Sequence, residues 1–259
     1  MNSKSDYIAV FDSGVGGISV LRELVKVMPS ERYLYFGDSA NAPYGTRTIQ
    51  EIRELTLAAA KKLVDKGIKA LVVACNTATS AAIEELRRKY PELIVVGIEP
   101  AVKLAVDNFP GGTVGVMATP VTLRENKFQM LWQRFRNKCR IVSIPAPGLV
   151  ELIEGGCIQG QKVEDLLEDL LAPYKGKLNA LVLGCTHYPF VEKAIQKVLG
   201  QSTVLLHGGR GTALQTQRRL AAAGLLREGD GEVCIENSLN CEKILTLSHQ
   251  LLTQEEDYG

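Results

Sequence analysis

The sequence lacks long apolar runs. No stretch reaches the roughly 18 hydrophobic residues that a membrane-spanning helix needs. The segment Met1 to Asp6 has neither the apolar core nor the cleavage site of a signal peptide and leads directly into a strand. An excess of either charge is also missing, because 30 basic and 29 acidic residues leave a net charge of +1. We therefore expect no membrane partner, no nucleic-acid partner and a cytoplasmic location.

Paired cysteine motifs are missing as well. The six cysteines include no CxxC pair, and the chain has only three histidines. A chain of 259 residues with 46% hydrophobic residues does not need disulfides to stabilise its core. No lysine stands in a loop typical of pyridoxal phosphate binding. We expect free thiols in a reducing compartment, no metal site and no cofactor.

Short apolar strands alternate with helical patterns along the chain. Strands are predicted at residues 7–11, 33–36, 70–74, 93–96, 114–117, 140–144, 180–183, 204–206 and 233–235. Helices are predicted at about residues 18–27, 49–66, 80–90, 123–135, 150–158, 163–171, 190–199, 213–223 and 242–252. This alternation predicts an α/β fold with parallel sheets and right-handed crossovers.

The order of elements repeats near residue 100. Each half runs strand, helix, strand and then a strand that ends in a cysteine, Cys75 or Cys185. We predict two similar doubly wound parallel-sheet domains that face one another across a central cleft. The first domain comprises residues 1–98 plus 209–259 and carries Cys75. The second comprises residues 99–208 and carries Cys185, so the C-terminal segment is expected to return to the first domain.

Both cysteines follow a buried strand and precede a predicted helix, in Leu71–Thr79 and Leu181–Pro189. Free N–H groups and the helix dipole favour a thiolate there, and a modest fall from a pKa of about 8.5 makes a base. The alternative for a single such cysteine is that it fills space in the core. Two at matching points predict a pair that removes a proton from one face of a carbon and returns one to the other. That reaction is racemisation or epimerisation without a cofactor.

A glycine-rich turn, Asp12–Gly17, joins the first strand to the first helix. It matches the dinucleotide-binding pattern only loosely, because the glycine spacing is incomplete and no acidic residue ends the second strand as a ribose partner does. The alternative is that backbone N–H groups at this helix start hold a small carboxylate.

Four stretches resemble the cofactor-independent aspartate/glutamate racemases, and among them the bacterial glutamate racemases. They are Phe11–Gly17, Gly37–Gly45, Ala74–Ala78 and Leu183–Pro189. The resemblance implies that Cys75 and Cys185 exchange the α-proton of glutamate on opposite faces, each as base in one direction and acid in the other. It also implies two α/β domains around the substrate, a homodimer, and supply of D-glutamate for peptidoglycan.

The resemblance also assigns residues that assist the two thiols. Asp12 is placed to help Cys75. His187 matches a residue that assists Cys185, and Glu154 is expected as a further acidic assistant with Glu151 as its rival.

A second group of residues is expected to bind the substrate's carboxylates and ammonium. These residues are Asp12, Ser13, Tyr44, Gly45, Asn76, Thr77, Thr186 and His187. Several have a structural alternative: Asp12 as a helix cap, Tyr44 as a packed loop aromatic, His187 as a structural histidine, and Asn76 and Thr77 as caps of the following helix.

Three segments depart from the family pattern: Thr119–Arg124, His207–Gly209 and the stretch from Asp230 onward. Two alternative functions remain open. One is another isomerase of the same chemistry, acting on aspartate, a hydantoin or maleate. The other is a non-catalytic ligand-binding module, although both cysteines are present.

Overall fold

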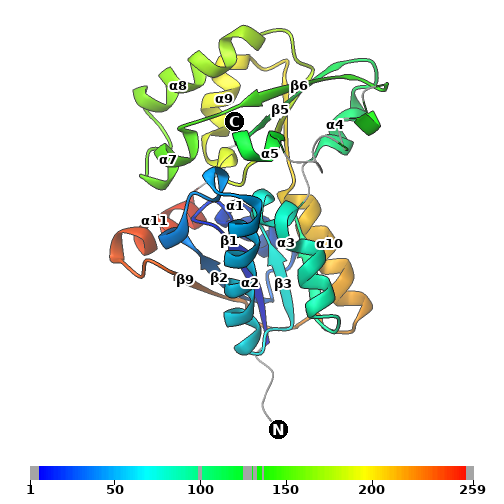
Figure 1. Cartoon of the computed structure of the whole chain (residues 1–259), viewed down its shortest axis with the longest axis vertical. Helices are drawn as coiled ribbons and strands as arrows, with labels where there is room; N and C mark the ends of the chain where they lie inside the picture. Colours follow the sequence, from blue (N-terminus) through cyan, green and yellow to red (C-terminus); the bar gives the residue numbers. More distant parts are fainter. Residues whose placement is uncertain (1–5, 99–100, 125–129, 131–132, 136, 255–259) are drawn as a thin grey trace.

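The structure is a computed structural model that describes residues 6–98, 101–124, 130, 133–135 and 137–254 (Figure 1). Two parallel sheets with helices on both faces make up this part of the chain, which confirms the predicted α/β class. Parts of the predicted helix 123–135, the segment Glu99–Pro100 after the fourth strand, and the start of the predicted second domain lie outside the described residues.

The two sheets share one strand order. The first sheet runs β4-β3-β1-β2-β9, with strands β1 (Tyr7–Asp12), β2 (Arg32–Gly37), β3 (Ala70–Val73), β4 (Ile94–Gly97) and β9 (Glu232–Asn237). The second runs β6-β5-β7-β8, with strands β5 (Thr113–Ala118), β6 (Arg140–Pro145), β7 (Ala180–Leu183) and β8 (Val204–His207). Strands β5 to β8 take the places of β1 to β4, and β9 is an added edge strand. The internal repeat predicted from the order of elements is therefore a repeat of topology.

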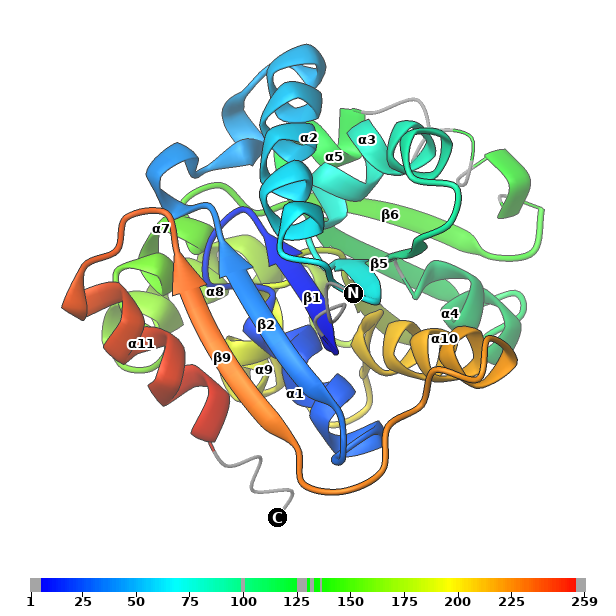
Figure 2. The ribbon, with the colours of Figure 1, turned by 90° about the horizontal axis from the view of Figure 1, so that it is seen from below.

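Helices cover both faces of each sheet (Figures 1 and 2). The α-helices are α1 (Ile18–Val27), α2 (Ile49–Asp65), α3 (Asn76–Lys89), α4 (Val102–Asn108), α5 (Pro120–Arg124), α7 (Leu149–Glu154), α8 (Gln161–Leu171), α9 (Glu192–Leu199), α10 (Gly209–Ala222) and α11 (Glu242–Thr253). Short 3₁₀ helices are η1 (Ser39–Asn41), η2 (Tyr44–Thr46), η3 (Ala172–Tyr174) and η4 (Tyr188–Val191). No helix among the described residues is both long and apolar enough to cross a membrane.

The central strand β1 shows why its sequence is apolar throughout. Ile8 and Val10 point into the core that includes α1, whereas Ala9 and Phe11 point into the core beneath α2 and α3. All four side chains are fully buried. A parallel strand covered on both faces needs a continuous apolar run rather than an alternating one.

The C-terminal segment returns to the first sheet. Helix α10 packs against α1 and β4, β9 pairs in parallel with β2, and α11 packs against α1 and β9. Figure 2 shows β1, β2 and β9 side by side with α11 at that edge. These contacts support our proposal that residues 1–98 and 209–259 form one domain and residues 99–208 the other.

Among the helix starts that differ from the prediction, two lie next to a cysteine. Helix α3 begins at Asn76 rather than Ser80, because the Cys75 side chain caps it and accepts a hydrogen bond from the backbone N of Ala78. After Cys185 the chain instead makes a turn and the 3₁₀ helix η4, and α9 begins only at Glu192.

Candidate active site

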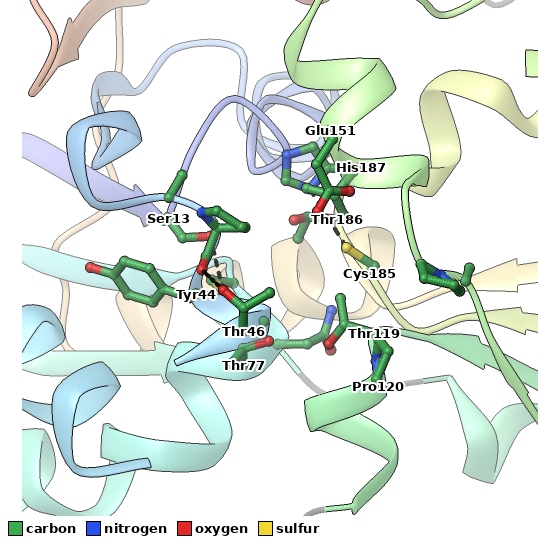
Figure 3. Close-up of a pocket in the computed structure, with 18 of the residues that line it drawn as sticks. Ser13, Tyr44, Thr46, Thr77, Thr119, Pro120, Glu151, Cys185, Thr186 and His187 are labelled. Atoms are coloured by element: carbon green, nitrogen blue, oxygen red, sulfur yellow. Dashed lines mark hydrogen bonds between the residues drawn. The ribbon is translucent and has the colours of Figure 1, made fainter. Parts of the chain in front are cut away.

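A cavity of about 330 Å³ lies between the two sheets, where the segments after β1, β2, β3, β5, β6 and β7 meet (Figure 3). The carboxyl ends of parallel strands are the usual place for a ligand site in α/β proteins. The cavity collects the predicted site residues except Asp12: Ser13, Tyr44, Gly45, Cys75, Asn76, Thr77, Glu151, Glu154, Cys185, Thr186 and His187.

Cys75 is the N-cap residue of α3 and is 6% exposed. Its Sγ accepts a hydrogen bond from Ala78 N at 3.4 Å and lies 3.5 Å from Ser13 Oγ. Burial, together with the nearby Asp12 carboxylate, nevertheless raises the pKa of the Cys75 thiol to about 12. The direction predicted from the helix dipole is therefore wrong for the unliganded site, because desolvation outweighs the helix terminus.

The surroundings of the Cys185 sulfur are set by a histidine. Its Sγ lies 3.5 Å from His187 Nδ1, and His187 Nε2 lies 2.7 Å from Glu154 Oε1. Burial alone lowers the pKa of His187, but its hydrogen bonds to Cys185 and Glu154 outweigh burial and hold that pKa well above its usual value. The imidazole is therefore cationic near neutral pH, with one N–H directed at the sulfur.

Glu154 rather than Glu151 contacts this histidine. Burial raises the pKa of Glu154, but the hydrogen bond and charge of His187, with the N–H of Val15, outweigh burial and hold it below its usual value. Glu151 lines the cavity and makes no hydrogen bond to His187 within the described residues. The geometry therefore favours Glu154 as the assistant of Cys185, which remains a proposal about its role.

Asp12 lies behind the cavity wall and is fully buried. Its Oδ1 accepts from Gly14 N at 2.9 Å, and its Oδ2 accepts from Thr186 Oγ1 at 3.1 Å. Burial and the Glu154 charge raise its pKa, although the His187 cation and both hydrogen bonds oppose this rise. Helix α1 is capped at Gly17, so the helix-cap alternative for Asp12 is wrong.

The glycine-rich turn holds carboxylates of the chain itself. Gly14 N donates to Asp12, and Val15 N donates to Glu154 Oε1 at 2.9 Å. A Cβ atom at Gly14 would overlap Glu154 Oε1, and one at Gly16 would overlap His187 Nδ1. These two glycines thus permit a close approach between the loops of the two sheets, whereas the expectation that this turn holds a small carboxylate stays a prediction.

Tyr44 supplies packing rather than a hydroxyl to the cavity. Its ring packs against Phe11 with centroids 6.4 Å apart, and its hydroxyl donates to Asp38 Oδ2 at 2.8 Å. Figure 3 shows the ring directed away from Cys185. The Tyr44 side chain is therefore a packed loop aromatic. Tyr44 and Gly45 still line the cavity as parts of the loop after β2.

Asn76 and Thr77 are the first two residues of α3, since Cys75 is its cap, so the capping alternative for them is wrong. Their backbone N–H groups come before the first intrahelical hydrogen bond. Asn76 Oδ1 is buried and accepts no hydrogen bond within the described residues. Thr77 Oγ1 lies 3.2 Å from Thr122 Oγ1, which links the α3 start to the segment after β5.

The sequence-based assignment missed the segment after β5. Thr119, Pro120 and Arg124 line the cavity, and Arg124 carries the permanent positive charge among the lining residues. The sequence does contain a helix-start pattern here, a threonine followed by a proline, which is common at the first helical position. In the structure, Thr119 Oγ1 accepts a hydrogen bond from Thr122 N. The other departing segment, His207–Gly209, does not line the cavity.

Within the described ranges, no three His, Cys, Asp or Glu side chains are grouped as metal ligands would be. The six cysteines are all free thiols. The expectation that no metal or cofactor takes part stays a prediction.

Comparison with known proteins gives consistent matches over nearly the whole chain. The family model described as Asp/Glu/Hydantoin racemase matches residues 11–210. The chain is 49% identical over 255 residues to the glutamate racemase of Clostridium acetobutylicum, covering 97% of this chain and 99% of that relative.

Two solved structures show the same architecture. The glutamate racemase of Francisella tularensis in complex with D-glutamate has a TM-score of 0.82 and 29% identity, covering 96% of this chain and 94% of that one. The Escherichia coli glutamate racemase in complex with L-glutamate and the activator UDP-MurNAc-ala has a TM-score of 0.81 and 30% identity, covering 95% and 92%.

Proposed function

Because the chain belongs to the Asp/Glu/Hydantoin racemase family, we propose that it interconverts L- and D-glutamate by proton exchange between two thiols. It is an amino-acid racemase of that family. The observation that carries the two-thiol mechanism is that Cys75 and Cys185, from different sheets, line one cavity. One thiolate removes the α-proton while the opposite thiol delivers its proton to the other face, which inverts the α-carbon.

The two sulfurs start in different surroundings, as this mechanism needs. Burial keeps Cys75 protonated near neutral pH, whereas Cys185 faces the cationic imidazole of His187. We propose that Cys185 is the base and Cys75 the acid in one direction. In the other direction the roles reverse, so that Cys75 is the base and Cys185 the acid.

The α3 start is suited to the amino-acid group of the substrate. The N–H groups of Asn76 and Thr77 and the positive end of the helix dipole are donors for a carboxylate, and negative charge grows there as the α-proton leaves. The unpartnered Asn76 Oδ1 is an acceptor for the ammonium. Ser13 and Thr186 add hydroxyl-bearing side chains to the cavity lining.

The second carboxylate of glutamate is expected at the segment after β5, which adjoins the α3 start through Thr77 and Thr122. Gly45, Thr119 and Arg124 line that region, and helix α5 packs against η2 there. The positive charge of Arg124 matches the net negative charge of glutamate. We propose that this region distinguishes the dicarboxylate from neutral amino acids.

We further propose that the D-glutamate supplies peptidoglycan precursors and that the protein works in the cytoplasm as a homodimer. A reducing compartment is needed because the mechanism requires both thiols to stay free.

The experiment is circular dichroism of L-glutamate and of L-aspartate with no cofactor added. Glutamate should lose its optical activity, whereas inversion of aspartate alone would refute glutamate as the substrate.

Cys75→Ser and Cys185→Ser should each lower the rate by about 10²–10⁴-fold, because a hydroxyl is far less acidic than a thiol. Cys157→Ser, a free cysteine that does not line the cavity, is the matched control and should keep normal turnover.

A further inference from the structure

We propose that Ser19 is a positioning residue that sets the Cys185–His187 turn from the opposite sheet, an inference that rests on the proposed two-thiol function. Ser19 lies in the first turn of α1 and is 6% exposed. Its Oγ lies 2.7 Å from the carbonyl oxygen of Thr186 and 2.9 Å from that of Gly16. Its one proton is shared between these two carbonyl oxygens, and the shorter contact is to the backbone of the residue between Cys185 and His187.

The turn that receives this hydrogen bond is held from both sheets: on its own side, Gly184 N donates to Met117 O and His187 Nε2 lies 2.7 Å from Glu154 Oε1. Strand β7 ends at Leu183, and the 3₁₀ helix η4 begins only at Tyr188. Within the turn, Tyr188 N donates to Cys185 O. The Thr186 carbonyl accepts from Ser19, and the Thr186 hydroxyl donates to Asp12. Both anchors of Thr186 thus come from the first sheet and the helix that follows it.

The contact between α1 and this turn is tight. A Cβ atom at Gly16 would overlap His187 Nδ1 and lie 2.5 Å from Thr186 Oγ1. Thr186 and His187 are 4% and 3% exposed, so little water reaches the contact. A shift at Ser19 therefore changes the position of His187 relative to Cys185. The distance between His187 Nδ1 and Cys185 Sγ is already 3.5 Å. Displacements of about 1 Å near a reacting group cost up to roughly 10²-fold in rate.

The test compares Ser19→Ala with a matched control, Ser248→Ala. Ser248 is also a buried helical serine, but its Oγ donates only to Ile244 O within α11. Ser19→Ala should lower kcat by about tenfold with a smaller change in KM, whereas Ser248→Ala should leave both unchanged. With α-deuterated L- and D-glutamate, the kinetic isotope effect of Ser19→Ala should rise more in one direction, because only the Cys185 step is slowed.

A second readout does not depend on racemisation. The rate at which iodoacetamide alkylates Cys185, followed by peptide mass spectrometry, should fall at least ~3-fold in Ser19→Ala and stay constant in Ser248→Ala, because His187 no longer faces the sulfur. If Ser19→Ala does not fold, Ser19→Cys keeps the size of the side chain with a weaker donor.

Unchanged isotope effects and an unchanged alkylation rate in the Ser19 variant would overturn the proposal, even if its kcat fell through loss of folded protein. The proposed function is refuted by a different result. If the wild-type chain did not racemise glutamate, that function would be refuted, and the alkylation rate alone would decide the role of Ser19.

Discussion

Glu154 Oε1 lies 2.7 Å from His187 Nε2 and 2.9 Å from Val15 N, so one oxygen joins the Cys185 turn to the α1 turn. The side chains involved are largely buried, with His187 3% and Glu154 17% exposed. The pair therefore contributes to stability as well as to the charge beside Cys185, and the two pKa shifts give that contribution a defined pH window.

The His187–Glu154 pair predicts the pH at which a Glu154→Gln substitution destabilises the protein most. Folding raises the pKa of His187 above 6.5, so its contribution is complete below 6.5 and is lost as pH rises through the folded value. Folding lowers the pKa of Glu154 below 4.5, so its contribution is complete above 4.5 and is lost as pH falls through the folded value. Glu154→Gln should thus cost about 1–3 kcal/mol near pH 5.5 and progressively less as pH rises through the folded pKa of His187.

Thermal unfolding of both proteins across this pH range measures the effect. A difference in Tm that did not shrink as the pH was raised above 6.5 into the alkaline range would show that the ion pair is not its source.

For single residues, the sequence predicted which residues form the site better than it predicted their protonation and their hydrogen-bond partners. It identified Cys75 at a strand end, but the raised pKa comes from burial and from Asp12, 63 positions away in the chain (75 − 12). Likewise, the Tyr44 hydroxyl is bound to Asp38, a pairing that no local pattern encodes. Desolvation and long-range contacts are properties of the fold, so single-residue chemistry could not be settled from spacing.

Among the elements, α1 connects the two halves of the site. The loop that leads into it from Asp12 at the end of β1 places Gly14 and Gly16 against the loops of the second sheet, and Ser19 extends that contact. The sequence showed the turn and the helix correctly, with α1 at the predicted residues 18–27. It did not reveal the partner, because the groups that fill the glycine turn come from residues 154 to 187.

A Gly16→Ala variant tests this docking. The added Cβ would overlap His187 Nδ1, so the turn must move and racemisation should fall by about 10-fold or more. Gly211→Ala is the control, because a Cβ there meets nothing within 4 Å in the first turn of α10. That substitution should stabilise the fold by about 0.5–1 kcal/mol through helix propensity and leave kcat unchanged.

Steady-state kinetics and Tm separate the two glycine variants. Normal turnover in Gly16→Ala would mean that the α1 turn does not constrain His187 in the working enzyme.

The succession of strands and helices along the chain, and its repeat, was the most predictable feature of the elements. Matching strands occupy matching places in both sheets because each half has the same succession of apolar strands and helices. The helix starts beside the cysteines were less predictable. A cysteine is an uncommon N-cap, so nothing in the local sequence placed the start of α3 at Asn76.

For the molecule as a whole, the cavity has walls from both sheets. Cross-links between them include Thr77 with Thr122 and Asp12 with Thr186. The apolar core that contains Ile8 and Val10 of β1 also contains Leu181 and Leu183 of β7, so the halves share buried surface. A ligand in this cavity should therefore stabilise both halves together.

Calorimetry with and without glutamate tests this coupling. At a concentration about 100 times Kd, glutamate should stabilise the protein by about 2.7 kcal/mol and shift the unfolding of both halves upward. A shift confined to one of two separate transitions would contradict a site shared by both sheets.

The most direct test of the two-thiol account is racemisation of L-glutamate in D2O, analysed after only a small part has reacted. Thiol hydrogens exchange with solvent, so the opposite thiol should deliver deuterium to the α-carbon. The account predicts D-glutamate that is almost fully α-deuterated, while the remaining L-glutamate keeps its α-protium. Equal deuterium in both enantiomers, or D-glutamate that retains the original proton, would contradict it, because a single group would then be removing and returning the proton.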